Sequence, residues 1–164
     1  MDILYLEDQI NESICSPLII YKEANQCKVK RQTTFQSKHW EVDDYNISQR
    51  FYNNFKNLYI DPLLFSTDIS LCNYLSVIEF SKGNYINTWN FFDQIQTKPS
   101  TLTFIAKITV SEYPISVEFI RDGKYFLNNY SVLIFPSCVK FGYRINPVKS
   151  DIDCIAIGSI LFEK

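Results

Sequence analysis

Short β-rich runs follow one another through the second half of the chain, and this pattern constrains the fold more than any other sequence feature. Turn-forming residues separate the runs, among them Gly, Pro and paired Asn. A series of short strands at such spacing is typical of a β-sandwich or a barrel. The runs that we predict as strands span residues 74–80, 101–110, 116–120, 124–126, 131–135, 140–145 and 154–162.

The first part of the chain has a different pattern. Apolar residues recur at helical spacing over residues 8–24 and again over the start of 46–64. Pro17 interrupts the first of these patterns, so we expect a first turn or a kink there. A short alternating segment at residues 2–6 predicts a strand, and residues 28–35 fit either a strand or an exposed loop.

The chain shows no internal repeat, low-complexity tract or Gly/Ser-rich linker. We therefore predict one domain over residues 1–164, with an α+β fold. Its N-terminal part, residues 1–72, is expected to be mainly helical, and residues 73–164 to form the β-sandwich. A chain of 164 residues is long enough to bury a core without disulfides or a structural metal.

Charge and hydropathy exclude several classes of partner. The net charge of −2, without a long run of one sign, argues against a sequence-independent nucleic-acid binder, so no nucleic acid is expected. No apolar run is long enough to span a bilayer, and the acidic N-terminus does not resemble a secretory signal. We expect no membrane partner and a cytoplasmic location at synthesis.

Residues with the chemistry of active or metal sites are few. The chain has 5 cysteines, none at CxxC spacing, and 1 histidine, so we expect reduced, inert thiols and no structural zinc. His39 is either a stray ligand or, in the favoured interpretation, a surface or satisfied side chain. The pair Asp43 and Asp44 is interpreted as solvated or helix-capping, not as an acid–base pair. No GxSxG elbow or Gly-rich phosphate loop is present.

The order of segments from about residue 75 to 162 resembles the double-stranded β-helix of iron(II)/2-oxoglutarate-dependent oxygenases, near the prolyl-hydroxylase branch. The residues that carry the resemblance are LSVIEFSKGNYINTWNFFD, then TLTFIAKITV, then SVEFIRDGKYF, and last LIFPSCVKFGYRINPVKSDIDCIAIGSILF with its Phe-Pro-Ser turn. The resemblance implies helices packed on a double-stranded β-helix, or jelly-roll, β-sandwich. It covers about half of the chain.

The residues that would carry the family's chemistry are absent at the matching positions. The first metal pair would fall near Asn87, with Trp89 and Phe91 at the His and Asp positions, and the distal histidine maps to Phe141. The arginine that would bind the cosubstrate maps near Asp153, which reverses the charge. An iron(II) facial triad needs two imidazoles and a carboxylate, which these residues do not supply. We therefore expect no catalytic, metal-binding or cofactor-binding residues.

Large side chains at these positions suggest that the former site is plugged. An emptied polar cup would be costly unless filled. We hypothesise a catalytically silent, oxygenase-like scaffold that acts as a structural or assembly protein, with other protein subunits as partners. Its composition would suit a bacteriophage or other virus particle. The alternatives are an active iron(II)/2-oxoglutarate-dependent dioxygenase with atypical ligands, or a small-molecule binding module that uses Arg144 or Lys149 for an anion.

Overall fold

The computed structural model describes residues 3–8, 10–31, 37–55, 68–90, 101–137 and 139–163. Its elements in chain order are β1 (Leu4–Leu6), α1 (Glu12–Ala24), η1 (Gln26–Lys28), β2 (Lys30–Arg31), β3 (Lys38–Glu41), α2 (Tyr45–Phe55), β4 (Asp68–Ser81), β5 (Ile86–Asn90), β6 (Thr101–Lys107), β7 (Ile115–Phe119), β8 (Gly123–Leu127), β9 (Val132–Pro136), η3 (Val139–Phe141), β10 (Tyr143–Ile145) and β11 (Ile152–Glu163).

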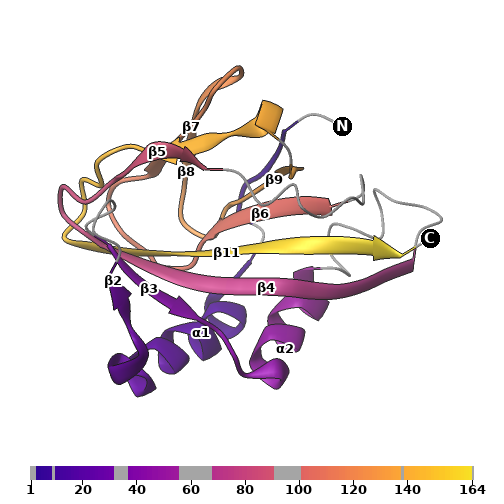
Figure 1. Cartoon of the computed structure of the whole chain (residues 1–164). Coiled ribbons are helices and arrows are strands. Elements are labelled where there is room, and N and C mark those ends of the chain that lie inside the picture. The colour runs from indigo at the N-terminus through magenta and orange to yellow at the C-terminus, as the bar shows by residue number, and fades with distance from the viewer. Residues whose placement is uncertain are drawn as a thin grey trace.

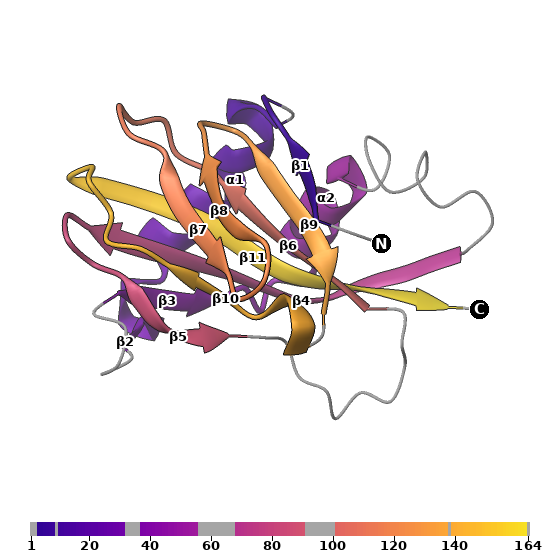
Figure 2. The same cartoon turned by 90° about the horizontal axis from the view of Figure 1, so that it is seen from above.

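Two antiparallel sheets and two helices form three layers. The larger sheet has 7 strands in the order β1-β9-β6-β11-β4-β3-β2, and the smaller has 4 strands in the order β5-β10-β7-β8. The helices α1 and α2 lie against one face of the larger sheet, and the smaller sheet lies against the other face (Figure 1). Seen from above, the smaller sheet lies over β6, β11 and β4 (Figure 2). The chain thus folds as a β-sandwich with helices on one outer face.

Alternation along the strands of the larger sheet divides the buried residues between two cores. Successive side chains of a strand point to opposite faces. On β11, Cys154 and Ala156 pack in the cluster between the larger sheet and the helices, whereas Ile155 and Ile157 pack between the two sheets. The near-continuous apolar run of this strand is therefore explained by burial on both faces.

Polar side chains define where both helices begin. The Asn11 side chain accepts a hydrogen bond from the Ile14 amide, so α1 begins at Glu12 and not at residue 8 as predicted. Asp44 accepts from the amides of Asn46 and Ile47 in the same way, which confirms the capping interpretation of this carboxylate. Helix α1 continues through Pro17 and ends at Ala24, with Asn25 as its C-cap, as predicted for its C-terminus.

The predicted strands of the second half are confirmed, with two corrections. Residues 140–145 were expected to be one strand, but η3 forms first and the strand covers only Tyr143–Ile145. The strand predicted over residues 101–110 ends at Lys107, although the Ile108 amide still donates to the Cys154 carbonyl of the neighbouring strand β11. The strand β5 was not among the predicted runs.

The N-terminal part is less helical than predicted. It contributes the strands β1, β2 and β3 and the start of β4 to the larger sheet, and β3 pairs with β4 directly. His39 lies in β3, although residues 1–72 are predicted to be mainly helical. Among the described residues no helix is long and apolar enough to cross a membrane.

Candidate functional site

The space between the two sheets, where the resemblance would place an active site, is occupied by an apolar cluster. Its members come from both sheets and from the segments that join them, and all are buried. They are Ile78, Phe80, Ile86, Ile105, Ile115, Val117, Phe119, Leu127, Leu133, Phe135, Phe141, Tyr143, Ile145, Val148, Ile155 and Ile157.

Aromatic rings in edge-to-face contact form the middle of this intersheet cluster. The ring centroids of Phe119 and Phe135 are 4.9 Å apart at an interplanar angle of 80°, and those of Phe135 and Tyr143 are 5.7 Å apart at 64°. These distances and angles are those preferred by aromatic pairs in protein cores. These rings therefore pack against one another as part of a core.

Phe141, at the position predicted for the distal histidine, lies in η3 and is 9% exposed. Its ring belongs to the intersheet cluster. The strand β10 that follows pairs with β5, which carries Asn87 and Trp89; Tyr143 is opposite Asn90, and Ile145 is opposite Ile86. The structure thus brings Phe141 close to the strand on which the first metal pair was predicted. The side chains of Asn87 and Trp89, and all of Phe91, lie outside the described residues.

Asp153, at the position mapped to the cosubstrate arginine, is fully buried at the start of β11. It pairs with Phe80, beside the turn that leads to β5, so it lies towards the end of the sandwich away from Phe141. Its carboxylate accepts hydrogen bonds from the hydroxyls of Thr109 (2.6 Å) and Ser111 (2.8 Å). The structure therefore separates Phe141 from Asp153.

Lys107 is the charged partner of Asp153, and both side chains are inaccessible to solvent. The Lys107 Nζ lies 3.6 Å from Asp153 Oδ1 and donates to the Ser111 hydroxyl at 2.6 Å, to the Tyr113 carbonyl and to the Asn129 side chain. Burial lowers the pKa of Lys107, although Asp153 acts to raise it. The donors and acceptors of this network are used within the protein.

Sequence reasoning missed Lys107. The signal that points to it is a lysine inside an otherwise apolar strand pattern, TLTFIAKITV. A charged residue at a buried strand position requires a partner of opposite charge. The partner, Asp153, is brought to it by the pairing of β6 with β11.

The single histidine, His39, lies in β3. His39 is half-buried on β3 opposite Ile78, and burial lowers its pKa although the nearby Glu41 acts to raise it. Within the part of the chain that the structure describes, no group of three or more His, Cys, Asp or Glu side chains could hold a metal ion.

The described cysteines are free thiols. Cys15 and Cys154 are buried, and burial raises the pKa of each to about 12, which keeps them protonated. Cys27 is also a free thiol but is exposed. The side chains of Cys72 and Cys138 lie outside the described residues.

Arg144, one of two residues considered for binding an anion, forms an ion pair on the smaller sheet. Its guanidinium donates to Glu118 Oε2 at 2.5 Å, and its side chain is 33% exposed. The neighbouring Tyr143 and Ile145 are buried, as the predicted alternation requires. The charge of Arg144 is therefore already balanced. Lys149, the second of these residues, is exposed in the segment between β10 and β11.

Comparison with known proteins adds to this geometry. No protein-family model and no curated protein matches the sequence. Several solved structures, in contrast, match the structure of this chain. The viral collagen prolyl hydroxylase of Paramecium bursaria Chlorella virus-1, in complex with 2-oxoglutarate, matches with a TM-score of 0.67 at 12% identity, covering 98% of this chain and 95% of that one.

Two further solved structures match over nearly the whole chain. The prolyl-4-hydroxylase of Pseudomonas putida has a TM-score of 0.63 at 6% identity, with 96% of this chain and 91% of that chain covered. HygX from Streptomyces hygroscopicus, with nickel and 2-oxoglutarate bound, has a TM-score of 0.64 at 6% identity. The match covers 96% of this chain and 82% of HygX. The resemblance predicted from the order of segments is thereby confirmed, and this chain has the fold of the prolyl hydroxylases of the 2-oxoglutarate-dependent oxygenase superfamily.

Proposed function

We propose that this chain is a non-catalytic scaffold that uses an oxygenase-like sandwich as a structural or assembly protein. The observation that carries the proposal is the apolar intersheet cluster, in which Phe141 and its aromatic neighbours occupy the space between the sheets. An active site needs a solvent-accessible cavity with convergent polar groups. A packed aromatic core has the opposite character and makes a rigid sandwich.

The strand pairings support a double-stranded β-helix as the detailed architecture. β4 pairs with β11, β5 with β10, β6 with β9, and β7 with β8, so the pairings are nested. Nested antiparallel pairings distributed over two facing sheets are what a jelly roll requires. We infer that strands β4 to β11 form this unit and that the helices are added outside it.

The residues at the mapped positions do not fit an iron(II) site. Phe141 and Phe91 have no donor atom, and the indole of Trp89 can only donate a hydrogen bond. The chain holds a single imidazole, on His39, whereas the facial triad takes two. The position mapped to the cosubstrate-binding arginine holds the Asp153 carboxylate, which is paired with Lys107. This chemistry favours a silent site.

The β7–β8 hairpin offers a surface for partner subunits. Ile120 is 47% exposed and Phe126 is 56% exposed on this hairpin. β8 is an edge strand of the smaller sheet. Edge strands and exposed apolar side chains are common sites of protein association. We propose other protein subunits as partners and, because Ile, Asn, Lys, Tyr and Phe are abundant, a virus or bacteriophage particle as the assembly.

Metal analysis combined with cosubstrate turnover tests the catalytic part of the proposal. The purified chain is loaded anaerobically with iron(II), desalted, and assayed for bound iron and for succinate formed from 2-oxoglutarate. We expect substoichiometric iron and no succinate. Stoichiometric iron or succinate production would establish the alternative, an active dioxygenase with atypical ligands.

The assembly part needs a separate measurement. Native mass spectrometry of the chain purified from its natural source should show a stable complex with other subunits. A stable complex buries well over about 1,000 Å². A strictly monomeric chain without a co-purifying partner would contradict the assembly role.

A further inference from the structure

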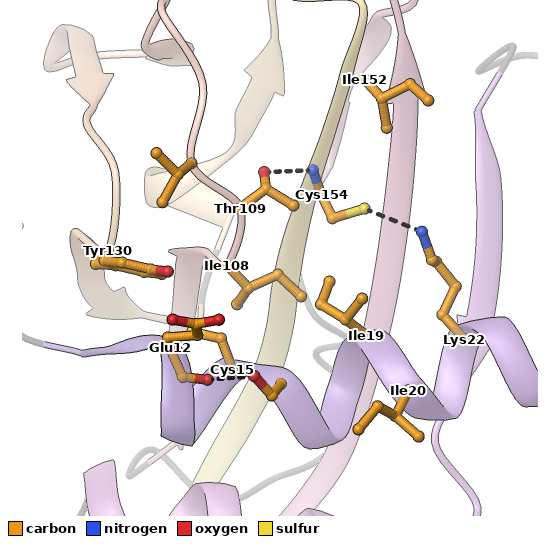
Figure 3. Close-up of a pocket in the computed structure, with 12 residues that line it drawn as sticks. Glu12, Cys15, Ile19, Ile20, Lys22, Ile108, Thr109, Tyr130, Ile152 and Cys154 are labelled. Carbon is orange, nitrogen blue, oxygen red and sulfur yellow. Dashed lines mark hydrogen bonds between the residues drawn. The ribbon is translucent and has the colours of Figure 1, made fainter.

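A pocket lies outside the sandwich, between α1 and the ends of β6 and β11, on the face opposite to the intersheet cluster. Its volume is about 550 Å³, within the range of small-molecule sites. Figure 3 shows α1 along one side, with Ile108 and Cys154 from the sheet facing it. Nothing in the proposed scaffold role accounts for this pocket.

Two polar groups of the pocket, Lys22 on α1 and Thr109 on the side of the sheet, already have partners. Lys22 Nζ pairs with Glu79 at 2.5 Å and with Glu23 at 3.1 Å, so its charge is balanced. The Thr109 hydroxyl donates to Asp153 and accepts from the Cys154 amide. Neither the Lys22 ammonium nor the Thr109 hydroxyl is therefore available to a ligand.

The rim of the pocket gathers exposed aliphatic side chains. Ile20 is 66% exposed, Val110 is 64% exposed and Ile152 is 58% exposed, and all three line the pocket. They come from α1, from the segment after β6 and from the start of β11. Isolated exposed aliphatic residues are ordinary, but a group around a concave site is typical of a binding surface.

Glu12, Tyr130 and Ser16 are the polar side chains at the other end of the pocket, and the Ser16 hydroxyl donates to the Glu12 carbonyl at 2.7 Å. In Figure 3 the Tyr130 hydroxyl and the Glu12 carboxylate face the same part of the pocket. Burial raises the pKa of Tyr130, and Cys15 and Glu12 raise it further, in line with the closeness of the carboxylate. Among the described residues no Lys or Arg forms an ion pair with Glu12.

The backbone holds Tyr130 in an unfavourable conformation. Its φ of 59° lies in the left-handed region, which is unfavourable for a residue other than glycine. Hydrogen bonds from the Ile10 amide to the Tyr130 carbonyl and from the Tyr130 amide to the Lys107 carbonyl maintain it. The surrounding structure thus keeps a phenol at the pocket where Gly or Asn would be less strained.

We propose that this pocket binds a small amphiphile with a protonated amine and an aliphatic chain. The amine lies between the Glu12 carboxylate and the Tyr130 hydroxyl and ring, which can accept its hydrogen bonds and interact with its charge. The aliphatic chain packs against Ile108, Ile19 and the exposed rim. The pocket shares no residue with the intersheet cluster, so a test of amphiphile binding does not test the scaffold role.

Calorimetric titration of the full chain with alkylammonium ions tests the proposal, with n-butyl-, n-hexyl- and n-octylammonium as the probes. We expect the affinity to rise about fourfold for each methylene that becomes buried. Octanoate is the matched anionic probe, because the N-terminal end of α1 by itself would favour an anion. Octylammonium should bind at least about tenfold more tightly than octanoate.

Variants locate the site. Glu12→Gln should weaken octylammonium binding about tenfold, and Tyr130→Phe should weaken it several-fold, because each removes an acceptor. Glu12 is exposed, so its variant should fold; an unchanged melting temperature verifies this. Ile20→Ser should lower the affinity for octylammonium more than that for butylammonium. Asp122→Asn, an equal change of charge in the β7–β8 turn, should have no effect.

Three results would overturn the proposal. The first is octylammonium binding weaker than about 1 mM in the wild-type chain. The second is octanoate binding as tight as octylammonium binding, which would mean that charge plays no part. The third is Glu12→Gln binding octylammonium as the wild type does, which would place the amphiphile elsewhere on the protein.

Discussion

Lys107 and Asp153 carry opposite charges where neither side chain has access to water. Removing one partner leaves the other charge buried and unpaired, so Lys107→Met should lower the free energy of unfolding by about 3–5 kcal/mol. The double variant with Asp153→Leu should recover much of this loss. Urea unfolding measures both. The control is Lys124→Met, whose ion pair with Glu118 is exposed on the lysine side and should contribute at most about 1 kcal/mol. A similarly small loss for Lys107→Met would show that this charge is solvated.

His39 gives the protein a pH dependence of predictable sign. Burial lowers its pKa below the ordinary value of 6.5, so the unfolded chain binds the proton more tightly than the folded one. Its contribution to stability is therefore fully present above about pH 6.5 and is lost as the pH falls below that value. The free energy of unfolding should drop less between about pH 7.5 and about pH 5 in His39→Gln than in the wild type. Equal drops would mean that His39 titrates alike in both states.

Helix α1 contains Pro17. Any other amino acid at this position would donate its backbone N–H to the Ser13 carbonyl. Proline removes that hydrogen bond and crowds the preceding turn, at a cost of up to about 3 kcal/mol relative to alanine. Pro17→Ala should therefore stabilise the chain by roughly 1–3 kcal/mol in thermal or urea unfolding. Pro147→Ala, in the exposed segment between β10 and β11, is the control and should be neutral or slightly destabilising. Destabilisation by Pro17→Ala would show that the ring is needed for packing.

Over the whole molecule, the rigidity of the sandwich rests on the filled space between its sheets. Phe141 is 9% exposed in that cluster, whereas Phe126 is 56% exposed on the smaller sheet. Phe141→Ala should lower the free energy of unfolding by about 3–5 kcal/mol, and Phe126→Ala by about 0.5 kcal/mol or less. Urea unfolding of the pair measures the difference. Similar small losses would indicate that Phe141 borders an open cavity and would weaken the scaffold proposal.

Much of the architecture could be predicted because the relevant signals are local. Alternation and turn residues locate β7, β8 and β9. Helical spacing locates α1 and α2, and the prediction that Asp44 caps a helix needed only its neighbours. The order of these segments was sufficient to predict the oxygenase-like fold. Element boundaries were less accurate, because capping by Asn11 and the formation of η3 depend on details of a few side chains.

The amino-acid sequence alone determined which side chains are present: a single imidazole, on His39, many large aromatic residues, and the alternation that builds two sheets. Only the tertiary structure decided which of these side chains meet. It paired Lys107 with Asp153, placed His39 in a strand, and brought Glu12 and Tyr130, far apart in sequence, to one pocket. The physical reason is that strand pairing and burial join residues at long sequence separation, and local preferences carry no information about such contacts.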